Sequence, residues 1–378
     1  MAGVKRINLR GSIGNWPVWP ETWHQLRRNG GRKDMPGRFG ERMRLPLSRL
    51  SYLFRAQRRQ SVARAAEVVG LRFLDAAATQ RLFLRPIARG IYRVEPDGNT
   101  RVTRSGVVRA GNNFLTLDYD SVTGLRASSL FPTRKRRHLP AVLPLWSQTW
   151  PSYYHWLIDI APRIAAAKLD LEDFSNIFFL YPGELNSVQR ETLEALGVAL
   201  SNVVNLHQSD PVSADTIYAM PLPGYRVIDP RIHALRTMLG KSGTPRRKLY
   251  LSRKGRRRVV NEADLYALLG RAGFEFITDD PRTLLEQIEL FSEATHVVAP
   301  HGAAMSNIIW CSARSRVLEL ANARYSPDYF KNLSAECNLE YRRLIFGAGA
   351  AHWTRTEDDI VVDLEEVRRF ISEEWRLQ

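Results

Sequence analysis

The chain has 378 residues, of which 44% are hydrophobic and 25% charged, a size and composition that can fill two ordinary cores. Its two cysteines, Cys311 and Cys337, are too few for a disulfide framework and show no metal-ligand spacing, so a reduced compartment is expected. No apolar run follows the first charges of the sequence, so no secretory signal peptide is expected.

Basic residues gather near the N-terminus. The net charge is +16, and residues 1–70 hold 15 Lys or Arg against four Asp or Glu, with Trp16, Trp19 and Trp23 among them. Three interpretations stay open: a solvated arm, a surface that meets anionic lipid headgroups or acidic polysaccharide, and a surface that meets nucleic acid. No RNA-binding signature or helix-turn-helix pattern supports the third.

Two different sequence patterns follow this basic segment. Residues 80–135 carry short alternating apolar runs between turn residues, which predicts antiparallel strands. From about residue 150 helices and strands alternate, which predicts a parallel sheet with crossover helices. The expected elements are a helix over 153–168, a strand over 177–181, a helix over 187–196, and short strands near Val203 and Ile217.

The second half shows a more regular alternation, after a proline- and glycine-rich linker at 221–247 that encloses one short helix. Strands are predicted over 248–252, 274–277, 296–299 and 316–320. Helices are predicted over 261–272, 282–293 and 303–309, the first of them opened by Asn261 as its N-cap. This alternation predicts an α/β class.

Three motifs in this region belong together by order and spacing. They are Tyr154-His155-Trp156-Leu157-Ile158-Asp159-Ile160-Ala161-Pro162-Arg163, then Lys248-Leu-Tyr-Leu-Ser-Arg253-Lys254, then His301-Gly302-Ala303-Ala304 with a later strand that carries Glu319. Each motif alone is weak. Jointly, over residues 145–345, the chain resembles the family 61 glycosyltransferases, of the type found in bacterial capsular polysaccharide and exopolysaccharide biosynthesis.

This resemblance implies a GT-B-like fold, with two Rossmann-like domains facing a cleft and a basic N-terminal arm. The expected domains are a basic segment at 1–75, an acceptor-side domain at 76–235, a nucleotide-sugar-binding domain at 236–345, and a strand and helix at 346–378 that pack back on the N-terminal domain. The implied activity is that of an inverting hexosyl- or pentosyltransferase. It would act in cell-surface polysaccharide biosynthesis in the cytoplasm, peripheral on the inner face of an anionic membrane.

The donor side of such a site needs positive charge at the leaving pyrophosphate. The residues predicted to bind the donor nucleotide are Arg253, Lys254, Gly302, Ala303, Ala304, Ser306, Asn307 and Glu319. Arg253 follows a strand, and the amides after Gly302 open a helix, where an anion is stabilised. Glu319 is expected either to bind the ribose hydroxyls or to form a salt bridge with Arg314 or Arg316.

Three residues are candidates for catalysis: His155, Asp159 and His301. On a helix, His155, Asp159 and Arg163 would share one face. Either Asp159 orients His155 as the base that deprotonates the acceptor, or Asp159 pairs with Arg163 and all three are structural. Pro162 should kink or restart this helix. His301, beside the glycine, is expected to donate to a phosphate or to the sugar.

The remaining predictions concern ligands. Asp118-Tyr119-Asp120 has the pattern of a metal-binding acid pair but is interpreted as a turn, so no metal is expected. The expected donor is a nucleotide sugar, with a UDP-sugar favoured, and the expected acceptor is a glycan or a lipid-linked glycan. Nucleic acid is not expected as a partner. The rival hypothesis is a non-catalytic α/β protein that binds acidic polymer or nucleic acid.

Overall fold

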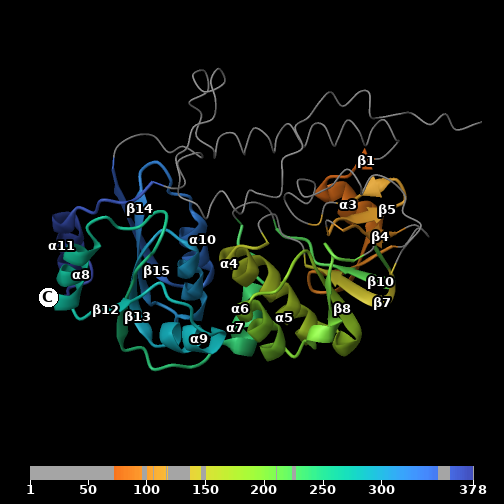
Figure 1. Cartoon of the computed structure of the whole chain (residues 1–378), viewed down its shortest axis with the longest axis horizontal. Coiled ribbons are helices and arrows are strands. Elements are labelled where there is room, and N and C mark those ends of the chain that lie inside the picture. Colours follow the sequence, from red (N-terminus) through yellow and green to blue (C-terminus); the bar gives the residue numbers. More distant parts are fainter. Residues whose placement is uncertain are drawn as a thin grey trace, which may run out of the picture. The chain divides into compact units, whose positions relative to one another are not determined.

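Two β-sheets with their helices make up the described part of the protein (Figure 1). The computed structural model describes residues 72–377, apart from 96–99, 105, 116, 118–136, 146–149, 210, 224–226 and 348–357. Both sheets belong to one compact unit of the chain. The pair Asp118 and Asp120 and nearly all of the predicted basic segment lie outside the described residues.

The first sheet is mixed. Its strands run in the order β1-β6-β5-β4-β10-β7-β8-β9, and β3 pairs with β10 and β2. Antiparallel pairing joins β2 to β3, β4 to β5 and β5 to β6, as the alternating runs predicted, while β10, β7, β8 and β9 are parallel. The bounds of the strands are Arg72–Phe73 (β1), Leu84–Ala88 (β2), Ile91–Val94 (β3), Arg101–Val102 (β4), Val108–Ala110 (β5), Asn113–Phe114 (β6), Arg137–Pro144 (β7), Ile177–Tyr181 (β8), Val203–Asn205 (β9) and Val212–Ala219 (β10).

The helices of this region connect or flank the parallel strands. They are α3 (Ala76–Phe83), α4 (Tyr153–His155), the π-helix η3 (Trp156–Ile160), α5 (Ala161–Asp170), the short η4 (Phe174–Asn176), α6 (Ser187–Ala195), the short η5 (Leu200–Asn202) and α7 (Ile232–Leu239). The predicted helix at 187–196 is α6, and the short helix predicted within the linker is α7. Every helix in the described part of the chain is too short or too polar to reach across a bilayer.

The second sheet is entirely parallel and has the order β12-β11-β13-β14-β15. Its elements are β11 (Arg247–Leu251), α8 (Glu262–Arg271), β12 (Glu275–Ile277), α9 (Leu284–Ser292), β13 (Ala294–Pro300), the 3₁₀ helix η6 (Ala303–Trp310), β14 (Arg316–Asn322), α10 (Tyr329–Glu336) and β15 (Glu340–Phe346). The predicted α/β class is therefore confirmed. In such a doubly wound order the connections reverse direction between β11 and β13, which is where α/β sheets bind ligands.

Alternate residues of each strand face opposite layers of helices. Leu249, Val297 and Val317 pack into the core shared with α9, η6 and α10, while Tyr250 and Leu318 face α8 and the C-terminal helix α11 (Leu364–Glu373). This alternation explains why the strands read as continuous apolar runs: both faces are buried. Figure 1 shows α8 and α11 on one side of these strands and α9 and α10 on the other.

The C-terminal helix corrects one prediction. We expected it to pack back on the N-terminal domain, yet Val367 and Ile371 of the helix, with Trp375 just after its end, are buried in the second sheet's core. Asn261 holds the segment before the helix: its amide donates to the Val362 carbonyl at 2.8 Å and accepts from the Val362 amide at 3.0 Å. Asn261 occupies the N-cap position of α8, but its side chain makes no capping bond.

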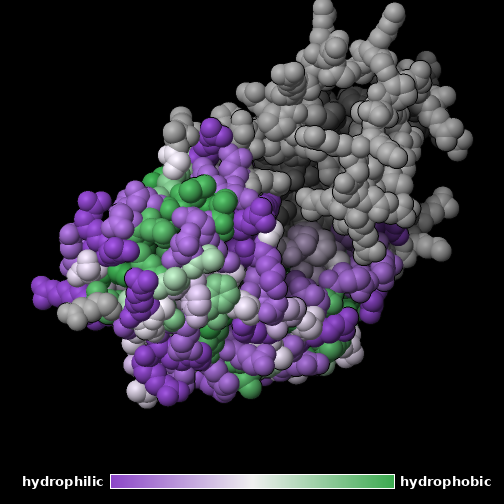
Figure 2. All heavy atoms as spheres, turned by 60° about the vertical axis from the view of Figure 1, so that its left-hand side comes forward, coloured by the Kyte–Doolittle hydropathy of each residue, from purple (hydrophilic) through white to green (hydrophobic). Residues whose placement is uncertain are grey.

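The surface of the second sheet's region is mostly hydrophilic, with smaller apolar patches between the charged side chains (Figure 2). The large apolar side chains exposed in this part of the chain are Val260, Tyr266, Leu285, Ile345 and Val361. Scattered apolar side chains of this kind are ordinary on a folded protein.

His296 in β13 should make the stability of the fold depend on pH. Its ring packs against Trp375, with centroids 4.8 Å apart. Burial, with the charges of Arg316 and Lys248, lowers the pKa of His296 to about 4. Between that pH and about 6.5, where an unfolded histidine titrates, the unfolded state binds the extra proton. The free energy of unfolding should therefore fall as the pH drops through this window.

Replacing His296 tests this dependence. In His296→Gln the fall between pH 6.5 and pH 4 should be smaller by about 1 to 2 kcal/mol, a value reduced for the partial exposure of the ring. Urea unfolding at several pH values measures it. His207→Gln removes an exposed histidine and is the control. Equal pH slopes in wild type and His296→Gln would contradict the assignment.

Candidate active site

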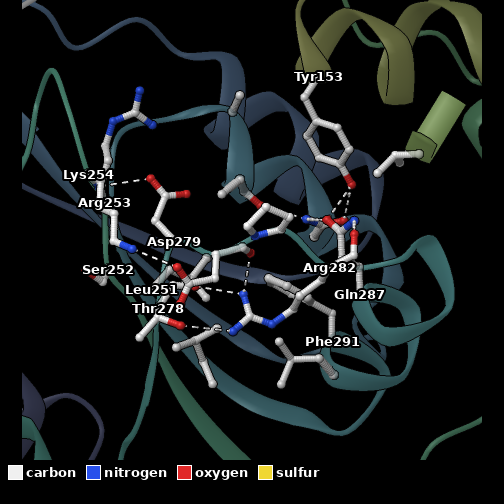
Figure 3. A pocket seen from close by; sticks show the side chains of 18 of the residues that line it. Tyr153, Leu251, Ser252, Arg253, Lys254, Thr278, Asp279, Arg282, Gln287 and Phe291 are labelled. Carbon is white, nitrogen blue, oxygen red and sulfur yellow. Dashed lines mark hydrogen bonds and ion pairs between the residues drawn. The ribbon is translucent and has the colours of Figure 1, made fainter. Parts of the chain in front are cut away.

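A cavity of about 380 Å³ lies where β11, β12 and β13 end, at the switch point of the second sheet (Figure 3). Its walls come from the ends of these strands, from α9 and η6, and from α4 and α6. The lining residues are Leu251 to Lys254, Ile277 to Arg282, Gln287, Leu290, Phe291, Ala303, Ala304, Asn307, Tyr153, Ser187 and Val188. Most of this wall comes from segments that leave the carboxyl ends of parallel strands, which is the usual ligand position in this architecture.

Arg253 is the cation best placed to bind an anion in this cavity. Its Nε donates to the Arg256 carbonyl at 2.6 Å, and no carboxylate of the described residues forms an ion pair with it. Burial and the charge of Arg256 lower the pKa of its guanidinium, with Asp279 acting in the opposite direction. A charge that is partly removed from water and has no directly bonded carboxylate is costly, so an incoming anion would be favoured here.

Gly302 lies directly under this guanidinium. A Cβ atom built on Gly302 would overlap the terminal nitrogen of Arg253, while the extended backbone, with φ of 178°, is one that any residue can adopt. Glycine is therefore needed for the close approach of Arg253 and not for its conformation. The structure brings together the two motifs that contain these residues, although about 50 positions separate them in the sequence.

Lys254, unlike Arg253, already forms an ion pair within the described residues. Its Nζ donates to Asp280 at 2.7 Å, and its backbone amide donates to Asp279 at 2.9 Å. The hydrogen bond and charge of Asp280 raise the pKa of the Lys254 ammonium. Because the side chain is exposed and already paired, a ligand would have to compete with Asp280 for it.

The helix after Gly302 is a 3₁₀ helix, where the sequence had indicated an ordinary helix. Ala303, Ala304 and Asn307 of this element line the cavity. Ser306 does not line the cavity: it is fully buried, and its hydroxyl has no hydrogen-bond partner among the described residues. Three successive small residues, from Gly302 to Ala304, leave the backbone open to a ligand at this point.

Tyr153 joins the two sheet regions at the cavity. Its hydroxyl lies 2.7 Å from Asn307 Oδ1 and 2.9 Å from Gln287 Oε1, and Asn307 Nδ2 donates to the same Gln287 oxygen at 2.9 Å. Figure 3 shows Tyr153 entering from the side opposite Lys254. Burial raises the pKa of Tyr153, which keeps the phenol neutral and able to donate. The sequence patterns did not single out Tyr153, although it directly precedes the first motif.

The first motif forms a helix that is interrupted by a π-helical turn at Trp156–Ile160. Pro162 lies in the first turn of α5, where its missing N–H costs little, so the helix restarts there as predicted. π-helical turns are frequent at functional sites. At the π-helical turn of this chain, His155 Nδ1 lies 2.5 Å from Asp159 Oδ2, while Arg163 Nε donates to the Asp159 backbone carbonyl at 2.8 Å.

Asp159 therefore contacts His155, as the first of the two interpretations required. A carboxylate at Nδ1 leaves the other ring nitrogen, Nε2, to interact with a ligand. The side chain of His155 is 19% exposed, so a small acceptor group can reach it. Whether His155 acts as a base stays a prediction.

His301 forms a second pair of the same type. Its Nδ1 is hydrogen-bonded to Glu319, which also accepts from the Tyr341 hydroxyl and, at 2.8 Å, from Arg343 Nε. Glu319 has no exposed surface and lies in the middle of β14. Its two oxygens are thus engaged by protein groups and not by an open ribose site.

The salt bridge considered for Glu319 exists with a different partner. Arg314 and Arg316 lie near Glu340, at 3.8 and 3.2 Å, whereas Glu319 pairs with Arg343. The physical reason is register: β14 and β15 are parallel, and Glu319 lies directly beside Arg343. Arg316 is three positions away along its own strand, roughly 10 Å.

One aromatic cluster connects the two histidines. Tyr154 packs against His155 with ring centroids 5.2 Å apart, and against Phe330 at 5.9 Å. Phe330 in turn packs against His301 at 5.1 Å, and Tyr329 lies between Tyr154 and His301. The structure therefore places both histidine–carboxylate pairs on one cluster beside the Arg253 loop.

Arg257 is a further residue that the sequence did not single out. It is buried, lies over the Tyr325 ring at 5.3 Å and has a φ of 61°. A positive φ in a residue other than glycine costs energy and is more common at functional sites. The nearby Gly255 is the only signal that the sequence offers for this tight loop.

Residues 153–318 match the family model described as Glycosyltransferase 61. The matched segment begins at Tyr153 and includes the His155–Asp159 pair, Arg253 and the loop at Gly302; Glu319 lies one residue beyond it. No curated protein matches the chain.

Proposed function

From this family 61 segment, we propose that the protein is an inverting, nucleotide-sugar-dependent glycosyltransferase of cell-surface polysaccharide biosynthesis. One observation carries the proposal: the Arg253 guanidinium lies beside Gly302 at the carboxyl ends of parallel strands, without a carboxylate partner among the described residues. Such a position suits the diphosphate of a nucleotide sugar.

The leaving group sets the demands on the donor side. As the bond between the anomeric carbon and the diphosphate oxygen breaks, negative charge develops on the diphosphate. Arg253 and the backbone amides of Ala303 and Ala304 are the proposed contacts to that charge, with Asn307 at the same wall. Lys254 could contribute after leaving Asp280. Stabilisation by protein groups of this kind requires no metal ion, which is part of the proposal.

His155 is the proposed base on the acceptor side. In a single displacement the acceptor hydroxyl attacks the anomeric carbon, the new C–O bond forms on the opposite face, and the hydroxyl proton passes to His155 Nε2. Asp159, at Nδ1, would stabilise the imidazolium that results. The anomeric configuration inverts because one displacement has taken place.

The domain arrangement, the substrates and the cellular location are proposed on the same basis. The two sheets suit a GT-B-like arrangement, in which the second sheet binds a UDP-sugar and the first faces a glycan or lipid-linked glycan acceptor. The transferred sugar would be a hexose or a pentose. A cytoplasmic place at the inner face of an anionic membrane would suit the net charge of +16. The predicted domain limits at 75 and 235 belong to this proposal, whereas the C-terminal helix belongs with the second sheet.

Nucleotide binding tests the function directly. In a thermal-shift screen of the whole chain with UDP, GDP, CMP and TDP, one nucleotide should stabilise the protein by about 2.7 kcal/mol at 100 times its dissociation constant. The matching nucleotide sugar should then release that nucleotide in the presence of an acceptor and of EDTA. No shift with any nucleotide would favour a non-catalytic binding protein. Release that stops with EDTA would contradict metal independence.

A further inference from the structure

A buried carboxylate with three protein partners stands behind His301. Glu319 has no exposed surface and is hydrogen-bonded to His301 Nδ1, the Tyr341 hydroxyl and Arg343 Nε. Burying a charge of this kind is expensive unless it is paired and fully hydrogen-bonded. His301, Tyr341 and Arg343 meet that requirement together, so they favour the ionised form of Glu319.

Arg343 is the counter-ion in this arrangement, and its own position is fixed on several sides. Its terminal nitrogens donate to the carbonyls of Ser326 and Pro327 at 3.0 and 2.8 Å, and to Asp328 at 3.1 Å. The loop between β14 and α10 thus holds the guanidinium against Glu319. Arg343 supplies the positive charge beside the buried Glu319, and a proton on His301 would place a second positive charge next to it.

The pKa shifts agree with this balance. Burial lowers the pKa of His301, and the charges of Arg257 and Arg343 act in the same direction, while Glu319 opposes them. Burial alone would raise the pKa of Glu319, but its hydrogen bond from His301, the charge of Arg343 and the Tyr341 hydroxyl lower it overall. His301 is therefore neutral and Glu319 ionised near neutral pH.

A neutral imidazole that donates from Nδ1 carries its lone pair on Nε2. Among the described residues no hydrogen-bond partner occupies His301 Nε2. The ring is held in place by Tyr325 and Phe330, with centroids at 5.3 and 5.1 Å. In this state His301 presents an acceptor at Nε2, whereas the sequence suggested a donor to a phosphate or to the sugar.

We propose that Tyr341 and Arg343 are positioning residues of this site: through Glu319 they fix His301 as a neutral hydrogen-bond acceptor at Nε2, directed at a hydroxyl group of the sugar substrate. The hydroxyl as ligand rests on the proposed transferase function. The tautomer and charge of His301 do not depend on that function, so they can be measured separately.

The ionisable groups around His301 determine the pH at which it takes up a proton. Glu319 faces it from β14, Tyr341 and Arg343 from β15, Arg257 from the loop after β11, Tyr325 from the loop after β14, and Tyr329 from α10. Of these, Arg343 is the cation in direct contact with Glu319. Without Arg343, the His301–Glu319 pair should take up a proton at higher pH, because a repelling charge is lost and Glu319 is left uncompensated.

The experiment compares Arg343→Met with Arg342→Met. Arg342 is the adjacent arginine of β15, is exposed and lies outside the site, so its variant removes the same charge without touching Glu319. Nitrogen-15 NMR of labelled histidine, assigned with a His301→Gln variant, reports tautomer and protonation in the full chain. The acid limb of the turnover profile also reflects the proposed base His155, so the NMR titration decides which part belongs to His301.

We expect wild-type His301 to be neutral with its proton on Nδ1. In Arg343→Met its protonation, and the acid limb, should move to higher pH by about one to three pH units, the size that a neighbouring charge produces. Arg343→Lys should restore most of the wild-type behaviour. Tyr341→Phe, which keeps the ring and should fold, should move both in the same direction by less. Arg342→Met should move neither.

Other outcomes would overturn the inference. They are a wild-type proton on Nε2, a protonated His301 at neutral pH, or equal profiles for the Tyr341→Phe variant, Arg342→Met and wild type. A loss of turnover in Arg343→Met with an unmoved pH profile would show a structural role only. If no nucleotide sugar is turned over but the NMR results hold, the transferase proposal fails, and the ligand of Nε2 is not a sugar hydroxyl of such a donor.

Discussion

His155→Ala should lower turnover by a factor of about 10² to 10⁴, which is the usual contribution of a general base. Nucleotide affinity should change little, because His155 does not line the cavity at the end of β11. Asp159→Asn should cost as much or less, since Asp159 acts through the 2.5 Å contact with His155. The double variant should be little worse than the poorer single, because residues that act as a unit are not additive.

A matched control exists for this prediction on the first sheet. His138 also pairs with an aspartate, Asp215, at 3.1 Å, but both side chains are exposed and neither lines the cavity. His138→Ala should therefore leave turnover unchanged. Steady-state rates with saturating donor and acceptor decide the matter. If His155→Ala keeps normal turnover, the base lies elsewhere, and if it lowers only the melting temperature, the pair is structural.

Arg253→Ala should weaken binding of the nucleoside diphosphate by about 1.5 to 3 kcal/mol, roughly 10- to 150-fold in dissociation constant. A charge-assisted hydrogen bond in a partly desolvated site has this magnitude. Gly302→Ala should weaken binding as well while leaving Arg253 in the chain, because the new methyl group displaces the guanidinium. The extended backbone of Gly302 means that folding should be little affected.

Lys254→Ala is the comparison for this pair of variants. Lys254 is exposed and bound to Asp280, so its removal should cost less than one factor of ten. Isothermal titration with the nucleotide found in the screen measures all three. Equal affinity of Arg253→Ala and wild type would remove Arg253 from the site, and a larger loss in Lys254→Ala would exchange their roles.

Together the two experiments separate binding from chemistry. A variant at Arg253 or Gly302 should raise the dissociation constant of the nucleotide, whereas a variant at His155 should lower the rate at saturation. A non-catalytic binding protein could show the first effect but has no reason to show the second.

Much of the fold was accessible from local patterns. The strand and helix alternation from residue 247 onward follows from apolar runs that are buried on both faces, and from the caps and turns between them, so element type and order could be predicted. The sequence also placed Arg253 and Gly302 at strand ends, because small and charged residues follow apolar runs there. Spacing placed His155, Asp159 and Arg163 on one helix face, but only the structure showed that the Asp159 carboxylate contacts His155.

Contacts between distant segments depended on the tertiary structure. Spacing cannot tell that the C-terminal helix covers the second sheet, because its apolar stripe would fit any exposed apolar face. Nor could it show that Glu319 turns inward to His301 and Arg343, since that depends on the pairing of β14 with β15. By itself the sequence determined which residues can carry charge and protons at the ends of the strands. The tertiary structure decided which of those groups neutralise one another and which stay open to a ligand, because charge balance in a buried site depends on distances that only folding sets.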